Sequence, residues 1–78
     1  MAHLIPIPTF GGNGFEAYER DVSLWRNATG VPIEKQALVS MLRLTGRPAA
    51  HAKAGPLTAY TKDSGAGDLL DFLREEFG

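Results

Sequence analysis

Residues 13–30, with the sequence NGFEAYERDVSLWRNATG, contain the only Trp of the chain and its clearest helical period. The large apolar side chains of this stretch recur at spacings of three and four residues. At about 100° per residue they share an arc of roughly 80°. The pattern therefore predicts a helix with one core-facing stripe, made of Phe15, Tyr18, Val22 and Trp25.

The ends and the second face of this helix are also marked in the sequence. Asn13 followed three residues later by Glu16 is typical of a capping box, and Gly30 suits the left-handed position after a helix. A second, smaller apolar strip that includes Leu24 lies about 100° from the centre of the aromatic stripe. This strip contacts either a neighbouring helix of the same domain or another molecule.

Length and composition limit the chain to one small domain. Its 78 residues include no Cys, so disulfides are excluded, and the two His, His3 and His51, have no clustered partners for a zinc site. An apolar fraction of 44% is ordinary for a globular domain and too high for a disordered chain of such low net charge. We expect a packed domain without metal or cofactor.

The charges and the hydropathy argue against several classes of partner. Eight basic and nine acidic residues give a formal net charge of −1, and neither sign forms a run, so the basic surface of a nucleic-acid-binding protein is not expected. No apolar stretch is long enough to span a membrane, and the N-terminus lacks the features of a signal peptide. We expect a soluble, cytoplasmic protein that binds neither nucleic acid nor membranes directly.

Residues 1–12 are predicted to form an extended arm that precedes a helical domain over residues 13–78. Pro6 and Pro8 each remove a backbone donor and favour an extended conformation of the residue before them. The arm is too apolar for a solvated tail, because it contains Leu4, Ile5, Ile7 and Phe10. It therefore lies in a groove of its own domain, which effective local concentration favours, or in a groove of a neighbouring molecule.

The chain after Gly30 begins with a second predicted helix, over residues 31–45. Pro32 is acceptable in the first turn of a helix, and the apolar side chains cover about half of the circumference. The buried half is expected to contain Ile33, Ala37, Leu38, Met41, Leu42 and Leu44. The polar half is expected to contain Lys35, Gln36, Ser40 and Arg43, and Val39 is the one apolar residue outside the buried half.

Two more helices complete the predicted fold. Gly46 precedes a short Ala-rich helix over residues 47–54. Asp63 or Ser64 caps a last helix whose core-facing stripe contains Ala66, Leu69, Leu70, Leu73 and Phe77. Phe72 lies off this stripe and is either a flanking core contact or an exposed contact site. The sequence thus predicts an all-α fold, a small orthogonal bundle of four to five helices with an extended N-terminal arm.

No arrangement in the sequence predicts catalysis, so we assign no catalytic residues. The acidic residues lie on the polar faces of the helices, and no nucleophile has a base at an obvious partnering position. His51 is accordingly expected to be a surface or partly packed residue. A DNA-binding helix-turn-helix over residues 31–54 would meet DNA with few basic side chains, so this alternative is weak.

In their order and spacing, these elements resemble the N-terminal lobe of the Gag capsid protein of long-terminal-repeat retrotransposons (gypsy-type, Arc-like). The resemblance covers about residues 6 to 77. It rests on PTFGG at 8–12, the aromatic helix that ends at Trp25, Lys35-Gln36, LRLTG at 42–46 and the closing LLxxLxxxF at 69–77. Pro48 and His51 depart from the family pattern in the third helix.

The resemblance implies a structural role. Such lobes form pentamers and hexamers in a capsid shell, and in Arc-like lobes a groove beside an extended N-terminal segment binds short peptides containing proline and aromatic residues. We therefore expect self-assembly, with Leu24 or Phe72 at a lobe–lobe contact. The predicted groove and arm residues are Ile5, Ile7, Phe10, Tyr18 and Trp25. A monomeric peptide-binding adaptor domain, with a groove beside the first helix, is the alternative.

Overall fold

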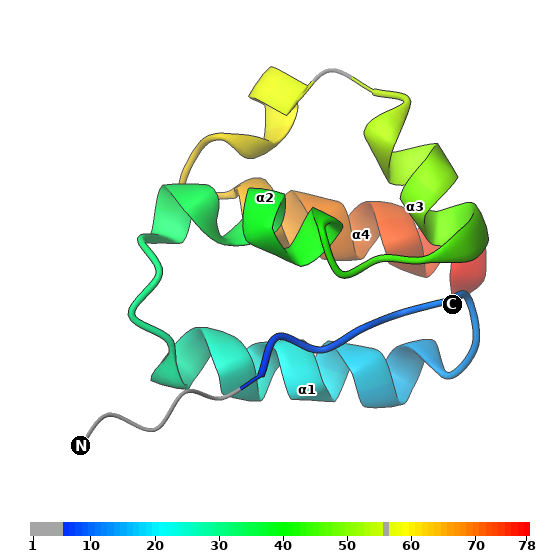
Figure 1. The fold of residues 1–78 in the computed structure, drawn as a ribbon, viewed down its shortest axis with the longest axis horizontal. Coiled ribbons are helices and arrows are strands. Elements are labelled where there is room, and N and C mark those ends of the chain that lie inside the picture. The colour runs from blue at the N-terminus through cyan, green and yellow to red at the C-terminus, as the bar shows by residue number, and fades with distance from the viewer. Residues whose placement is uncertain (1–5, 56) are drawn as a thin grey trace.

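The computed structural model of the protein describes residues 6–55 and 57–78 (Figure 1). The elements follow in the order α1 (Phe15–Ala28), η1 (Ile33–Lys35), α2 (Gln36–Met41), α3 (Gly46–Lys53), η2 (Leu57–Tyr60) and α4 (Gly65–Phe77), where η denotes a 3-10 helix. Within the described ranges there is no β-strand, only an isolated bridge between Phe10 and Leu44. The predicted all-α fold class is confirmed.

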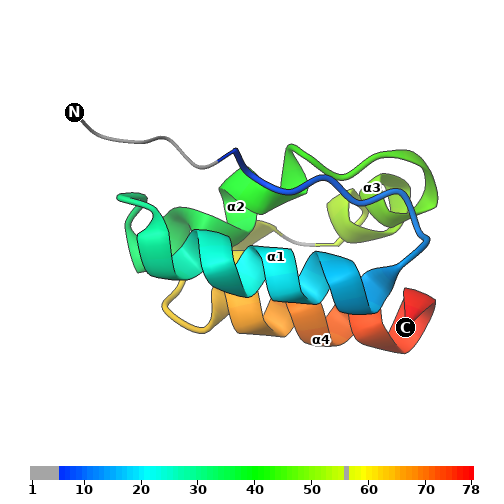
Figure 2. The ribbon, with the colours of Figure 1, turned by 90° about the horizontal axis from the view of Figure 1, so that it is seen from below.

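The helix α4 is the centre of the arrangement, because it packs against α1, α2 and α3. α1 and α4 run in opposite directions (Figures 1 and 2). The arm runs alongside α1, and the chain then reverses direction to enter that helix. Figure 2 shows α2 and α4 on opposite sides of the molecule, with α3 at one end. The outward faces of α2 and α4 are therefore directed away from each other.

The core confirms the aromatic stripe that the sequence predicts for α1. Its four residues, Phe15, Tyr18, Val22 and Trp25, expose at most 5% of their surface. The stripe of α4 meets them, with Leu69 and Leu73 exposed by 1% or less. A buried side chain of this size stabilises the fold by roughly 1.5–3 kcal/mol relative to an exposed one. All of these residues except Trp25 belong to one hydrophobic cluster, whose other members are Phe10, Ala37, Met41, Leu44, Ala52, Ala66 and Leu70.

The predicted ends of the first helix are wrong. The helix begins at Phe15, and its N-cap is Gly14, whose positive φ of 71° is a left-handed conformation that glycine tolerates. No side chain caps this end, so Asn13 and Glu16 do not form a capping box. At the other end Thr29 is extended and donates its N–H to the carbonyl of Trp25 at 2.8 Å, and Gly30 does not adopt a positive φ.

The single helix predicted for residues 31–45 is also wrong. Pro32 is extended, η1 and α2 follow, and the helix ends at Met41. Buried and exposed positions are partly exchanged relative to the prediction. Gln36 and Ser40 are buried, whereas Ile33 and Leu42 expose 46% and 74% of their surface. The buried amide of Gln36 is satisfied, because it accepts from Arg26 Nε at 3.0 Å and donates to the carbonyl of Val31 at 3.2 Å.

The last two helices lie close to their predicted positions. α3 starts one residue early, at Gly46, whose φ of 60° turns the chain into the helix. Ser64 occupies the N-cap position of α4, but its hydroxyl donates to the carboxylate of Asp68 at 3.1 Å and makes no bond to the backbone. Within the described residues, no helix is both long and apolar enough to cross a membrane.

Candidate functional site

The arm is held in place by Phe10, which is 98% buried. Its N–H donates to the carbonyl of Arg43 at 3.4 Å, and its carbonyl accepts from the N–H of Thr45 at 2.9 Å. These bonds form the parallel bridge that includes Leu44. The arm is thereby attached to the loop between α2 and α3 by main-chain bonds as well as by burial of an aromatic ring.

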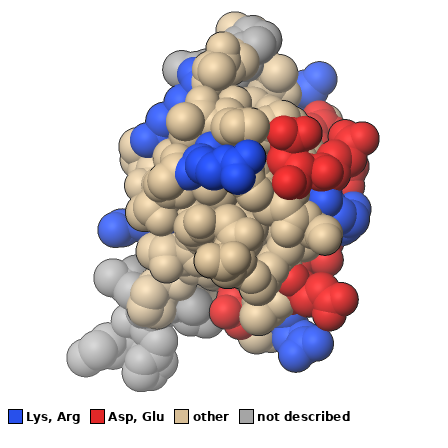
Figure 3. All heavy atoms as spheres, turned by 90° about the vertical axis from the view of Figure 1, so that its right-hand side faces the viewer, with Lys and Arg blue, Asp and Glu red and all other residues tan. Residues whose placement is uncertain are grey.

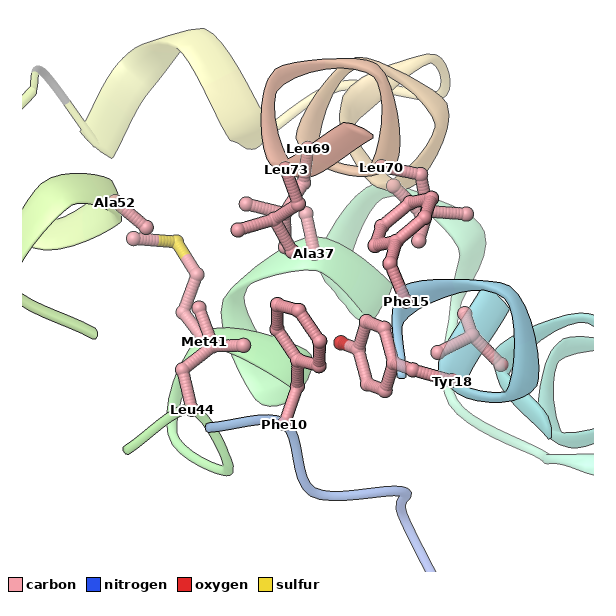
Figure 4. Packing of buried hydrophobic residues seen from close by; sticks show 12 residues of the cluster. Phe10, Phe15, Tyr18, Ala37, Met41, Leu44, Ala52, Leu69, Leu70 and Leu73 are labelled. Atoms are coloured by element: carbon pink, nitrogen blue, oxygen red, sulfur yellow. The ribbon is translucent and has the colours of Figure 1, made fainter. Parts of the chain in front are cut away.

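The ring of Phe10 contacts aromatic residues of two helices, and Figure 4 shows it beside Phe15 and Tyr18 of α1. It stacks on Tyr18 of α1, with ring centroids 4.7 Å apart, and meets Phe15 edge-on at 5.8 Å. Phe77 of α4 approaches it edge-on at 5.9 Å. Offset-stacked and edge-on pairs of this kind stabilise by about 0.5–1.5 kcal/mol beyond the burial of area.

The hydroxyl of Tyr18 points into the hydrophobic cluster (Figure 4). It is buried, and within the described part of the chain it has no hydrogen-bond partner; the hydroxyl of Ser40 shares this state. Burial raises the pKa of Tyr18 to about 12, because removal from water disfavours the charged phenolate. The arm therefore rests on a buried, uncharged phenol ring.

Beyond Phe10, the arm and α1 form a shallow depression of about 530 Å³. The arm contributes residues 6–9, and α1 contributes Asp21 and Leu24. Ile7 is half-buried here, while Leu24 exposes 62% of its surface. Ile5, the other predicted arm residue, lies outside the described residues.

The five predicted groove and arm residues thus divide into different roles. Phe10 and Tyr18 are in direct contact, and Ile7 lies beside Leu24 in the depression. Trp25 is 98% buried and belongs to the interior. The groove surface offered to solvent is formed by the arm and Leu24, because the α1 aromatic rings lie beneath it.

A second apolar surface, which the sequence analysis missed, lies on α2. Leu42, Leu38 and Val39 border a depression of about 510 Å³, with Met41 among its lining residues and Lys53 of α3 beside it. Val39 was the available signal. It is the one apolar residue outside the predicted buried half, and it lies three residues before Leu42, at a spacing that brings side chains together on a helix.

His51 has a partner that the sequence did not suggest. Its Nδ1 lies 3.1 Å from the Oε1 of Glu76, and its ring contacts Phe77 edge-on at 5.7 Å. Arg47 lies over the same Phe77 ring at 6.0 Å. The side chains of His51 and Glu76 are 39% and 42% exposed, so this pair lies on the surface where α3 meets α4. The described residues contain no group of three or more His, Cys, Asp or Glu that could hold a metal ion.

Arg74 connects α4 with α1. It bonds Glu19 on α1 and Asp71 one turn earlier on α4, the latter at 2.9 Å, and it lies over the Phe15 ring at 5.8 Å. These ion pairs are largely exposed, and such pairs contribute little to stability. They do fix the position of the acidic side chains on this side of the molecule.

The two predicted interface residues occupy different environments. Leu24 is exposed beside the arm, whereas Phe72 is half-buried and packs against the core cluster from α4. Leu24 therefore has the larger area free for a contact.

Comparison of the chain with protein-family models, curated proteins and solved structures found no match.

Proposed function

We propose that this chain is a structural domain that assembles with copies of itself, as capsid lobes of long-terminal-repeat retrotransposons do. The observation that carries the proposal is the exposure of two leucines beside apolar depressions. Leu24 is 62% and Leu42 is 74% exposed, and each borders such a depression. Single exposed apolar residues are common, but exposed residues grouped into patches mark protein–protein contacts.

The position of the arm supports the same proposal. The resemblance implies a groove beside an extended N-terminal segment, and here residues 6–9 lie against α1. The arm and Leu24 together form one surface that a neighbouring lobe would cover. A chain of this length buries only about 60% of its unfolded surface, so assembly would also add stability.

Sedimentation velocity over a range of concentrations, combined with electron microscopy of concentrated samples, tests the proposal. We expect mass to rise with concentration and particles to form. Leu24→Glu should weaken association, whereas Arg20→Glu, one turn earlier on α1 and also exposed, should not. Circular dichroism checks that both variants fold. A wild-type chain that stays monomeric, or assembly that survives charged substitutions at both Leu24 and Phe72, would contradict the proposal.

A monomeric peptide-binding adaptor is the second candidate, favoured by the depression between the arm and α1. Titration with short peptides rich in proline and aromatic residues separates it from assembly. Saturable binding by a chain whose mass stays that of a monomer would favour the adaptor.

A further inference from the structure

The charges of the chain are divided between two opposite sides of the molecule. Residues 35–62, which include α2 and α3, contain five Lys or Arg and no Asp or Glu. Residues 63–78, which include α4, contain five Asp or Glu and one Arg. In Figure 3 the charged side chains at the upper left are Lys and Arg, whereas Asp and Glu gather at the right, where some Lys and Arg also lie. The net charge of −1 thus conceals a basic side and an acidic side.

The basic side carries the apolar depression of α2. Leu42 projects there with 74% of its surface exposed, and Lys53 lines the same depression. Arg43, the next residue after Leu42, is also exposed. An exposed leucine flanked by cations is thus the main feature of this side.

The acidic side carries the reverse combination on α4. Asp68, Asp71, Phe72 and Glu75 follow the spacing of one helical face, at positions i, i+3, i+4 and i+7. The three acidic residues are exposed, and Phe72 is partly buried at the edge of this face. An aromatic ring flanked by carboxylates is what an exposed leucine flanked by cations would meet favourably.

Ion pairs within the domain leave the basic side free. In the described part of the chain, salt bridges are made by Arg74 of α4 and by His51 of α3, whose partner Glu76 is on α4. None of the five basic residues in 35–62 takes part in one. Arg47 rests on the Phe77 ring, which leaves its charge uncompensated.

We propose that the basic side of one copy, centred on Leu42 and Lys53, docks on the acidic α4 side of a second copy. This inference rests on the proposed self-assembly and specifies its geometry. The two surfaces differ and lie on opposite sides of the domain, so the contact is heterologous and repeats from copy to copy (Figure 2). Repetition closes into a ring if the rotation between copies permits and forms an open chain if it does not. Charge complementarity sets the direction of docking, because like-facing copies would repel.

Charge reversal on each side tests this geometry. Lys53→Glu and Glu75→Lys should each raise the concentration needed for association at least about tenfold, as measured by sedimentation velocity. An equimolar mixture of the two variants should restore association, since the intact acidic side of one matches the intact basic side of the other. Arg20→Glu and Glu16→Lys are the matched controls, because they make the same charge changes on exposed positions of α1. Neither control should change association.

The outcomes separate this inference from the proposed function. If the wild-type chain never associates, both fail. If it associates and either charge variant behaves as wild type, the docking geometry is overturned while assembly stands. Two weakened variants that do not rescue each other also overturn it. Leu42→Ser should weaken association as much as Lys53→Glu while leaving the urea unfolding midpoint within error, and unchanged association would contradict the central place given to Leu42.

Discussion

α4 and the segment from Ile33 to Thr45 carry similar helical patterns in the sequence, yet they differ in structure. α4 is one continuous helix with a buried stripe. The other segment divides into η1, α2 and a turn, and it exposes Leu42 while burying Ser40. The backbone explains the difference, because the segment around Leu44 bonds to the arm, whereas α4 keeps its bonds within the helix.

An apolar period therefore predicts burial only where the backbone continues as a helix. Where a helix stops, the apolar residues that follow no longer keep to its buried face. Leu42, in the turn after Met41, is exposed, whereas Leu44, at the bridge to the arm, is buried. The following predictions test whether the arm and the core, rather than local propensity, determine how the two segments differ.

The largest effect is expected for Phe10→Ala, which removes the side chain that seats the arm. Loss of a buried Phe costs about 3–5 kcal/mol, a large part of the stability of a small domain. Urea unfolding measures this loss, and deletion of residues 1–10 should give a similar one. Thr9→Ala, an exposed neighbour in the arm, is the control. A loss below about 1 kcal/mol would show that the arm is not part of the fold.

The next effect compares the two segments directly. Leu73→Ala in α4 should cost about 2–5 kcal/mol, because Leu73 is fully buried. Leu42→Ala should change the free energy of unfolding by less than about 0.5 kcal/mol, because Leu42 is 74% exposed. Chemical unfolding of both variants checks the pair, and equal losses would remove the distinction between the segments.

A third test concerns the buried ring of Tyr18 beneath the arm. Burial raises the pKa of Tyr18 from 10.0 to about 12, so the unfolded chain loses this proton first as pH rises. Below pH 10 the Tyr18 proton does not lower the free energy of unfolding. As pH rises from 10 toward about 12, that free energy falls by an amount on the order of 2–3 kcal/mol. The free energy of unfolding should fall more steeply over this range in the wild type than in Tyr18→Phe.

At neutral pH, Tyr18→Phe should change stability by less than about 1 kcal/mol, because the lost hydroxyl has no partner among the described residues. If the free energy of unfolding falls equally with pH in the wild type and in Tyr18→Phe, the Tyr18 ring is exposed to water and the arm is loosely held.

Smaller effects than those of the core substitutions, and of opposite sign to each other, are expected at two glycines. Gly46 follows the segment from Ile33 to Thr45 and begins α3 with a φ of 60°, so Gly46→Ala should cost about 1–2 kcal/mol. Gly67 lies inside α4, where a Cβ would meet no atom within 4 Å, so Gly67→Ala should stabilise by about 0.5–1 kcal/mol. Thermal denaturation measures both. Effects of the same sign would contradict the distinction between a turn and a regular helix.

The sequence was sufficient for the parts of the fold that depend on local pattern. The aromatic stripe of α1 and the leucine stripe of α4 were predicted correctly, because each follows a 3.6-residue period over three or more turns. The caps of α1 were not. The N-cap of α1 is Gly14 in a left-handed conformation, and no side chain caps the helix there, so the expected cap by Asn13 is absent.

The candidate surfaces were harder to predict, because they depend on contacts across the chain. Phe10 was placed in the arm, but its bonds to Arg43 and Thr45 join residues more than thirty positions apart. These bonds end the helix that a periodic pattern would extend. The pairing of His51 with Glu76 likewise spans 25 residues and has no local signal.

The Thr45 amide donates to the Phe10 carbonyl, so hydrogen exchange of this one amide reports on the attachment of the N-terminal segment. Thr45 is itself exposed, so its amide is protected from hydrogen exchange through that bond, at 2.9 Å. Its exchange rate records how often the N-terminal segment detaches while the helices persist. In a shell, the same proton would register whether a neighbouring copy clamps the segment down or pulls it free.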